Sequence, residues 1–182
     1  YSKIIKQLYP EVPLVIGGIE ASLRRLTHYD YWSDRLCPSI LADSGADLLF
    51  YGMSEKSIIE FARFMQWGVK VHNLTTIPQT AFMVEENVTY NTRKEWEEME
   101  LSSHESCQAD KKVFARNFVD IEKESDRFES GRKLIQRVGN KKVVINPPWP
   151  VSGENETDRF YDLPFTRLPH PRYKGKDPIP AY

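Results

Sequence analysis

The chain has 182 residues, and its 40% hydrophobic content is enough to fill the core of one compact domain. Its 25 basic and 26 acidic residues leave a formal net charge of −1, so the chain lacks the basic excess that is typical of nucleic-acid-binding proteins. No apolar run approaches the roughly 18 residues of a membrane span and no signal peptide is visible, so we expect a cytoplasmic protein with reduced thiols.

Helical and strand-like segments alternate in the first part of the chain. Residues 1–9 have the apolar spacing of a helix, which Pro10 ends. Apolar runs at 13–17 and 46–51 are typical of buried strands in a parallel sheet, and 55–67 carries an apolar helical stripe. This order predicts a βαβ arrangement, and hence an α/β fold with a partial parallel, Rossmann-like sheet.

A third strand is expected at 79–84, after which the composition becomes rich in charge. Thr92 and Glu95 have the spacing of a capping box, which predicts the start of a helix. Apolar residues at helical spacing predict a long amphipathic helix over 110–125 and another helix over 130–138. The middle of the chain is therefore predicted to be a helical insertion.

The last part is predicted to be a short strand at 141–146, followed by an extended, proline-rich strap up to the end of the chain. The predicted domains are an α/β half-domain at 1–89, the helical insertion at 90–140, and the strand with its extended connection at 141–182. Because the sequence begins inside a helix and ends in a proline-rich run, we expect it to be a piece of a longer protein.

A glycine pair, Gly17 and Gly18, follows the first predicted strand. Ligands of open parallel sheets collect at the carboxyl ends of strands, and glycine lets the backbone approach a ligand closely. The pair lacks the spacing of GxGxxG and has no GK[ST], which argues against a dinucleotide site or a P-loop. A tight turn with nothing bound is the alternative interpretation.

The next stretch, LRRLTHYDYWSD, concentrates arginine and aromatic side chains. Its arginines can pair with phosphate or carboxylate, its rings supply stacking faces, and His28 next to Asp30 could do acid–base work. Alternatively, its leucines and rings pack on the sheet edge and its charges are solvated. The candidate ligand- or partner-facing residues are Gly17, Gly18, Glu20, Ser22, Arg24, Arg25, His28, Tyr29, Tyr31 and Trp32.

No catalytic or metal-binding residue is predicted. The two cysteines, Cys37 and Cys107, are too far apart for a CxxC or CxxxCxxC motif and are interpreted as structural thiols. His72 and His104 have no partner at the spacing of a zinc helix. The glutamates near residue 97 are interpreted as a solvated helix face rather than a metal site: Glu95, Glu97, Glu98 and Glu100.

Three blocks carry a resemblance to a known family. They are GGIEASLRRLTHYDYWSDRLCPSILADSGADLLFYGMSEKSI (17–58), NPPWPVSGENETDRFYDLPFTRLPHPRY (146–173) and IPAY (179–182). Together they resemble the YgiQ-like radical S-adenosylmethionine proteins in order and over nearly the whole chain.

The resemblance implies a longer enzyme, in which an N-terminal cobalamin-binding-like α/β domain precedes a radical S-adenosylmethionine barrel. In that family the CxxxCxxC motif, which holds a four-iron four-sulfur cluster and leaves one iron open for S-adenosylmethionine, follows the segment that matches 179–182. The cluster ligands match nothing in this chain, and no DxHxxG-like loop is present, which argues against a corrinoid here.

Three hypotheses follow for this chain. The leading one is a catalytically silent N-terminal region that caps or docks on the enzyme's own barrel, with the glycine turn and the Arg24–Trp32 segment facing substrate or barrel. The second is a module that binds a small ligand, such as a nucleotide or a corrinoid, at the same turn. The third is a purely structural docking module. The resemblance leaves the substrate of the longer enzyme open.

Overall fold

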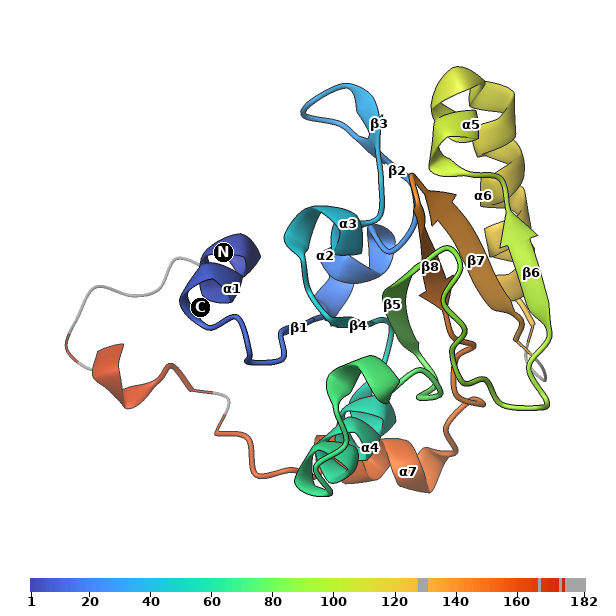
Figure 1. The fold of residues 1–182 in the computed structure, drawn as a ribbon. Helices are drawn as coiled ribbons and strands as arrows, with labels where there is room; N and C mark the ends of the chain where they lie inside the picture. Colours follow the sequence, from blue (N-terminus) through green and yellow to red (C-terminus); the bar gives the residue numbers. More distant parts are fainter. Residues whose placement is uncertain (128–130, 167, 174, 176–182) are drawn as a thin grey trace. The chain divides into compact units, whose positions relative to one another are not determined.

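A six-stranded mixed sheet is the centre of residues 1–151 in the computed structural model (Figure 1). The structure describes residues 1–127, 131–166, 168–173 and 175. In spatial order the strands are β1 (Val15–Ile16), β4 (Leu48–Phe50), β5 (Thr80–Glu85), β8 (Lys141–Ile145), β7 (Lys133–Val138) and β6 (Glu98–Leu101). β1 and β4 pair in parallel, as do β6 and β7, and the other three pairings are antiparallel.

Helices and one hairpin surround this sheet. Between β1 and β4 the chain forms α2 (Gly18–Leu23), the hairpin of β2 (His28–Asp30) and β3 (Arg35–Cys37), and α3 (Ile40–Ser44). The remaining helices of this part are α1 (Ser2–Leu8), α4 (Glu55–Gln66), the 3-10 helix η1 (Val71–Asn73), α5 (His104–Ala109) and α6 (Lys111–Ser125). Residues 152–182 form a separate unit with α7 (Glu154–Tyr161) and the 3-10 helix η2 (Pro171–Tyr173).

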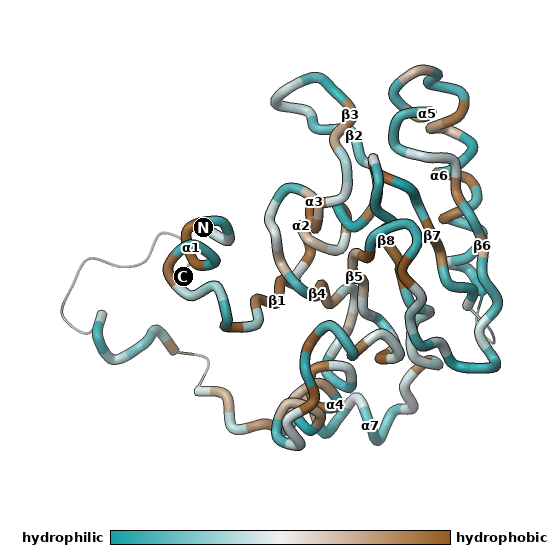
Figure 2. The backbone as a smooth tube through the Cα atoms, viewed as in Figure 1, coloured by the Kyte–Doolittle hydropathy of each residue, from teal (hydrophilic) through white to brown (hydrophobic). Residues whose placement is uncertain are grey.

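Both faces of the sheet are buried. Neighbouring residues of a strand point to opposite faces, and here they lie in two different apolar clusters. Leu49 and Val143 lie in one apolar cluster with residues of α2, α3 and α6. Leu48 and Val144 lie in a second cluster, where Phe61 of α4 also packs. In Figure 2 hydrophobic residues fill the last part of β8, in the middle of the sheet. Coverage of both faces confirms the predicted α/β class.

The predicted start of the fold is confirmed. Both strands of the βαβ arrangement form and pair in parallel, with Val15 opposite Leu48. The helix predicted at 55–67 is α4, and its first residue follows Ser54 as expected. The strands predicted at 79–84 and 141–146 are β5 and β8, and the helix predicted at 110–125 is α6.

Two helical predictions in the middle of the chain are wrong, because the segments are strands. The helix expected from the Thr92–Glu95 capping box does not form, since the Thr92 hydroxyl accepts a hydrogen bond from Lys133 Nζ at 3.1 Å. Instead β6 follows, and Glu98 and Glu100 are exposed while Leu101 is buried, which is the alternation of a strand and not a solvated helix face.

The second of these helices, predicted over 130–138, is β7 from Lys133 onward, whereas residue 130 lies outside the described residues. β7 has neighbours on both sides, and its buried positions include Lys133 and Gln136. These buried polar residues give the strand an amphipathic helical pattern. The predicted boundaries at 89/90 and 140/141 fall within one sheet, because β6, β7 and β8 join β5.

The predicted extension of residues 147–182 is wrong for α7. This helix has Glu154 and Glu156 in its first turn and Arg159 in its last turn, charges that favour the helix dipole. The predicted extension of 176–182, including the IPAY block, lies outside the described residues. In the described part of the chain, no helix combines the length and the apolar character that a membrane span requires.

Candidate functional site

The carboxyl ends of β1, β4 and β8 lie at one edge of the sheet, and the Gly17–Gly18 turn belongs to this edge. Gly18 has a φ of +88°, a backbone conformation that favours glycine. The Ser22 hydroxyl donates to the Gly18 carbonyl at 2.8 Å and accepts from the Gly52 amide at 3.1 Å. Ser22 therefore fixes the turn against the loop that follows β4.

An open groove of about 790 Å³ lies beside this turn, between the ends of β1 and β4 and one side of α4. None of its lining residues is charged. Ile58 is 50% exposed and Val15 is 37% exposed, so apolar surface is accessible there. The lining residues are Val15, Ile16, Gly17, Gly18, Phe50, Ser54, Ile58, Phe61, Ala62, Met65 and Gln66.

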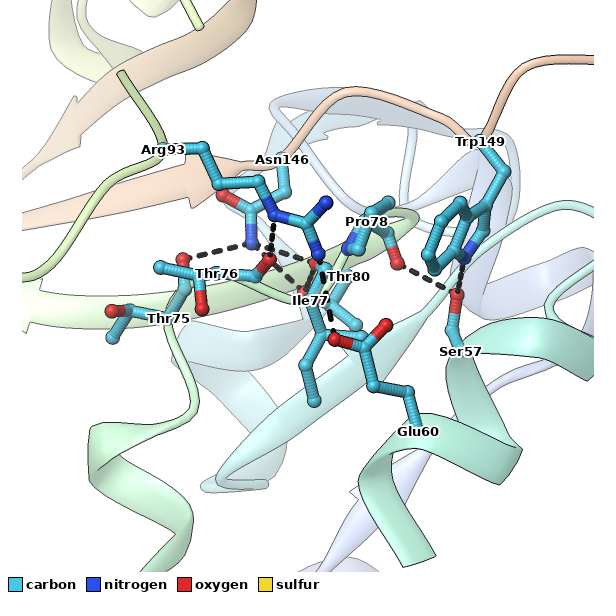
Figure 3. Close-up of polar contacts among 10 residues, drawn as sticks. All are labelled: Ser57, Glu60, Thr75, Thr76, Ile77, Pro78, Thr80, Arg93, Asn146 and Trp149. Atoms are coloured by element: carbon cyan, nitrogen blue, oxygen red, sulfur yellow. Dashed lines mark hydrogen bonds and ion pairs between the residues drawn. The ribbon is translucent and has the colours of Figure 1, made fainter. Parts of the chain in front are cut away.

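The first turn of α4, the helix that lines one side of the groove, is bonded to the NPPWP segment (Figure 3). Trp149 donates its indole N–H to the Ser57 hydroxyl at 3.1 Å, and that hydroxyl donates to the Pro78 carbonyl at 2.6 Å. Ser57 is completely buried. Two separate segments, the loop at Pro78 and the NPPWP segment, therefore hold the first turn of α4 in place.

Asn146, the first residue of NPPWP, organises the loop before β5. Its buried side-chain amide donates to the carbonyls of Thr75 and Ile77 at 3.0 and 2.9 Å and to the Thr80 hydroxyl at 3.0 Å (Figure 3). The Tyr51 hydroxyl donates to the Asn146 carbonyl at 2.5 Å. This network links the ends of β4 and β8 to the beginning of β5.

Arg93 completes the polar network around α4 (Figure 3). Its Nε donates to the Thr76 carbonyl at 2.9 Å, and its guanidinium lies 3.4 Å from Glu60. The same group lies over the rings of Trp96 and Trp149, at 5.0 and 5.6 Å from their centroids. Burial raises the pKa of Glu60, and the nearby charge of Arg93 opposes this shift. The Arg93 guanidinium is thus paired with groups of the chain itself.

The structure does not bring the ten predicted residues together on one surface. Arg24 forms ion pairs with Glu20 at 3.4 Å and with Asp30 at 3.3 Å, so its charge is already paired within the fold. Tyr31 and Trp32 lie at the tip of the β2–β3 hairpin, where they are 77% and 88% exposed. Their rings meet edge to face at a centroid distance of 5.8 Å.

Arg25, His28 and Tyr29 line a separate pocket of about 230 Å³ beside α6. The sequence also raised the hypothesis of acid–base work by His28 with Asp30, but each of the two side chains has another partner. His28 Nδ1 lies 3.1 Å from the Leu26 carbonyl, and the Asp30 carboxylate accepts hydrogen bonds from Ser33. Burial lowers the pKa of His28, so the neutral ring is favoured near pH 7.

The thiols do not fit an iron–sulfur cluster. Cys37 is half-buried in β3, whereas Cys107 is buried in α5 and lies 3.2 Å from the Asn117 side-chain amide. Burial raises the pKa of the Cys107 thiol, which disfavours the thiolate that a metal needs. Within the described residues, no group of three or more His, Cys, Asp or Glu side chains could hold a metal ion.

Four residues of the α4 network were not predicted from the sequence: Ser57, Arg93, Asn146 and Trp149. The NPPWP motif was available as a signal, because prolines on both sides of a tryptophan end the strand and restrict the backbone there. The partners of this ring come from positions 57 and 93, and no local spacing connects them to residue 149.

The fold and site together define an α/β domain that carries an uncharged groove at the carboxyl edge of its sheet. The chain matches the family described as "Radical SAM N-terminal" over residues 1–182, and it belongs to that family. This confirms the resemblance to YgiQ-like radical S-adenosylmethionine proteins.

Curated relatives similar to this chain are named "UPF0313 protein". The protein of Bacteroides thetaiotaomicron is 50% identical over all of this chain and 30% of its own length. That of Porphyromonas gingivalis is 49% identical over 97% of the chain and 27% of its own length, and that of Methanocella arvoryzae is 40% identical over 100% and 29%. The chain thus spans less than a third of these relatives. No solved structure matches it.

Proposed function

We propose that this chain is the N-terminal region of a longer radical S-adenosylmethionine enzyme and that its groove docks on the catalytic barrel of the same enzyme. The family description and the greater length of the relatives support the first part. In this proposal the enzyme is cytoplasmic, and its iron–sulfur cluster and S-adenosylmethionine belong to the barrel, where they would generate the radical.

The uncharged groove beside Gly17 and Gly18 is the observation that carries the docking role. An accessible apolar surface is typical of a site that another protein surface covers. A nucleotide would bring phosphate charge, and no lining side chain of the groove could pair with it. The groove therefore favours the docking hypothesis over a small ligand at the same turn.

Photo-crosslinking tests this contact directly. In the full-length enzyme, the photoreactive amino acid p-benzoylphenylalanine replaces Ile58, which lines the groove. Ile59 provides the matched control, since it is the next residue of α4, is 45% exposed and does not line the groove. After irradiation and protease digestion, mass spectrometry identifies the crosslinked peptides.

We expect crosslinks from position 58 to segments beyond residue 182, and far fewer of them from position 59. Equal crosslinking from both positions would contradict docking at the groove. So would crosslinks from position 58 that stay within 1–182. A second measurement uses Ile58→Asp, which places a charge in the groove and should lower the rate of S-adenosylmethionine cleavage by the reconstituted enzyme, whereas Ile59→Asp should not.

A further inference from the structure

The pocket beside α6 is unrelated to the groove. It lies between the segment from Leu23 to Tyr29 and one side of α6, and its volume is about 230 Å³. Leu26 and Ile121, which line it, belong to the apolar cluster on the α6 face of the sheet, whereas Phe50 and Phe61 of the groove belong to the other cluster. The two cavities share no lining residue.

Two buried polar atoms without a partner come from residues of this pocket. Among the described residues, three buried side-chain nitrogen or oxygen atoms have no hydrogen-bond partner: Arg25 Nε, His28 Nε2 and Asn146 Oδ1. Arg25 and His28 both line the pocket. Because buried polar groups are nearly always hydrogen-bonded, a concentration of unpaired ones beside a cavity indicates a missing ligand.

Among the described residues, the charge of Arg25 has no carboxylate counter-ion. Its guanidinium donates to the Ser22 carbonyl at 2.5 Å and lies over the Tyr51 ring at 5.1 Å from the centroid. No carboxylate of the described residues lies within ion-pair distance of it, although Glu122 also lines the pocket. Burial lowers the pKa of Arg25, and Tyr51 and Glu122 oppose this shift. An anion in the pocket would stabilise this cation.

His28 offers a hydrogen-bond acceptor, whereas Arg25 offers donors. A carbonyl oxygen can only accept, so the contact between Nδ1 and the Leu26 carbonyl assigns the ring proton to Nδ1. Nε2 of the neutral ring then carries a lone pair that can accept a hydrogen bond. The pocket thus combines a donor at Arg25 with two acceptors, His28 Nε2 and the Glu122 carboxylate, between apolar walls that include Phe114 and Phe118.

We propose that this pocket binds a small zwitterionic amino acid with an apolar side chain. The carboxylate would pair with Arg25, the ammonium group would donate to His28 Nε2 and Glu122, and the side chain would lie against Phe114 and Phe118. The volume agrees, because about 230 Å³ holds about eight waters of about 30 Å³ each, close to the size of leucine with about nine non-hydrogen atoms.

Titration of the full-length protein with L-leucine, followed by ligand-observed NMR, tests this site. Two analogues of leucine test its two charged groups separately: 3-methylbutylamine lacks the carboxylate, and 4-methylpentanoic acid lacks the amine. We expect leucine to bind with a Kd of about 1 mM or below, and each analogue to bind about tenfold more weakly. No saturable binding of leucine up to about 10 mM, or an analogue that binds as tightly as leucine, would overturn the proposal.

Arg25→Gln removes the cation and should weaken leucine binding by about tenfold or more. Arg24→Gln is the matched control, because Arg24 is the neighbouring arginine but does not line the pocket, and it should change the Kd by less than about twofold. Thermal melting confirms that each variant is folded. If Arg25→Gln unfolds, Phe118→Asp replaces it, since Phe118 is 56% exposed and lines the pocket. Undiminished binding by whichever of the two variants is folded would refute the site.

Discussion

The hydroxyl of Tyr51, just after β4, donates a hydrogen bond of 2.5 Å to the main-chain carbonyl of Asn146, just after β8. β5 lies between these two strands, so the bond spans the central pairings of the sheet at its carboxyl edge. Burial raises the pKa of Tyr51 well above its usual range, which keeps the hydroxyl protonated as a donor. The edge that holds the groove is thus closed by side chains as well as by the strand ladder.

Tyr51→Phe removes this donor and leaves the Asn146 carbonyl without it inside the protein. We expect the free energy of unfolding to fall by about 1–3 kcal/mol, measured by urea denaturation. Tyr29→Phe is the control, because the Tyr29 hydroxyl donates to Asp34 at 2.7 Å on an exposed hairpin and its loss should cost less than about 0.5 kcal/mol. Equal effects of the two changes would contradict a special role of the Tyr51 bond.

Asn146→Asp should be more damaging, since a carboxylate would face the three oxygen atoms that now accept from the Asn146 amide. The expected loss at pH 7 is about 3 kcal/mol or more. Protonation of the new acid restores a donor, so the loss should shrink as the pH is lowered toward about 5.

Asn140→Asp is the matched control, because Asn140 is exposed and donates only to Glu85, at 3.1 Å. Its cost should stay below about 1 kcal/mol, as is usual for surface changes. Urea denaturation at several pH values compares the two variants. A loss for Asn146→Asp that grows toward low pH would show that the buried amide is not the important donor.

The strands and helices that the sequence predicted correctly are those whose burial follows one simple period. Leu48, Leu49 and Phe50 are all buried, as expected for an internal strand, and α4 carries its apolar stripe on one face. β7 was predicted wrongly, because its buried residues include the polar Lys133 and Gln136. Their side chains donate hydrogen bonds to Thr92 and Ser102, which lie far away in the sequence. Such long-range pairing cannot be inferred from local spacing.

The glycine turn was placed correctly, but the predicted surface behind it was not. Arg24 and Arg25 are neighbours with similar sequence contexts, yet Arg24 is paired with carboxylates and Arg25 is turned to a pocket on α6. Which arginine keeps an unpaired nitrogen depends on the β2–β3 hairpin and on α6, whose pocket-lining residues lie far from Arg25 in the sequence. Local sequence spacing, which relates residues three or four apart on one helix, carries no information about such contacts.

The two glycines of the turn should differ in their tolerance of a side chain. Gly18 has a φ of +88°, so Gly18→Ala is strained even though the space around it is open, and it should cost about 1–2 kcal/mol. Gly17 has an extended backbone with a φ of −166°, and an added Cβ would lie 3.4 Å from the Phe50 carbonyl oxygen, an ordinary contact. Gly17→Ala should therefore cost less. Urea denaturation gives the ranking, and the reverse order would contradict it.

Histidine titration should make the protein less stable in mild acid. Burial lowers the pKa of both His28 and His104 from the ordinary value of 6.5, and the charges that act on them include Arg24, Asp30, Asp43 and Glu105. Since the folded pKa values lie below the unfolded ones, the unfolded state binds more protons as the pH falls through 6.5. The stability that depends on the neutral rings is therefore fully present above pH 6.5, and it is lost as the pH falls from 6.5 toward the folded pKa values.

We therefore expect the free energy of unfolding to decrease between about pH 7.5 and about pH 5, and to decrease less in a variant with His28→Gln and His104→Gln. His104 contributes because it is buried, which lowers its pKa, and its Nδ1 lies 3.1 Å from the Thr27 hydroxyl. NMR titration of the two imidazole rings checks the cause, because both midpoints should lie below 6.5. If either midpoint lies above that value, burial does not control the ring and the predicted pH dependence loses its basis.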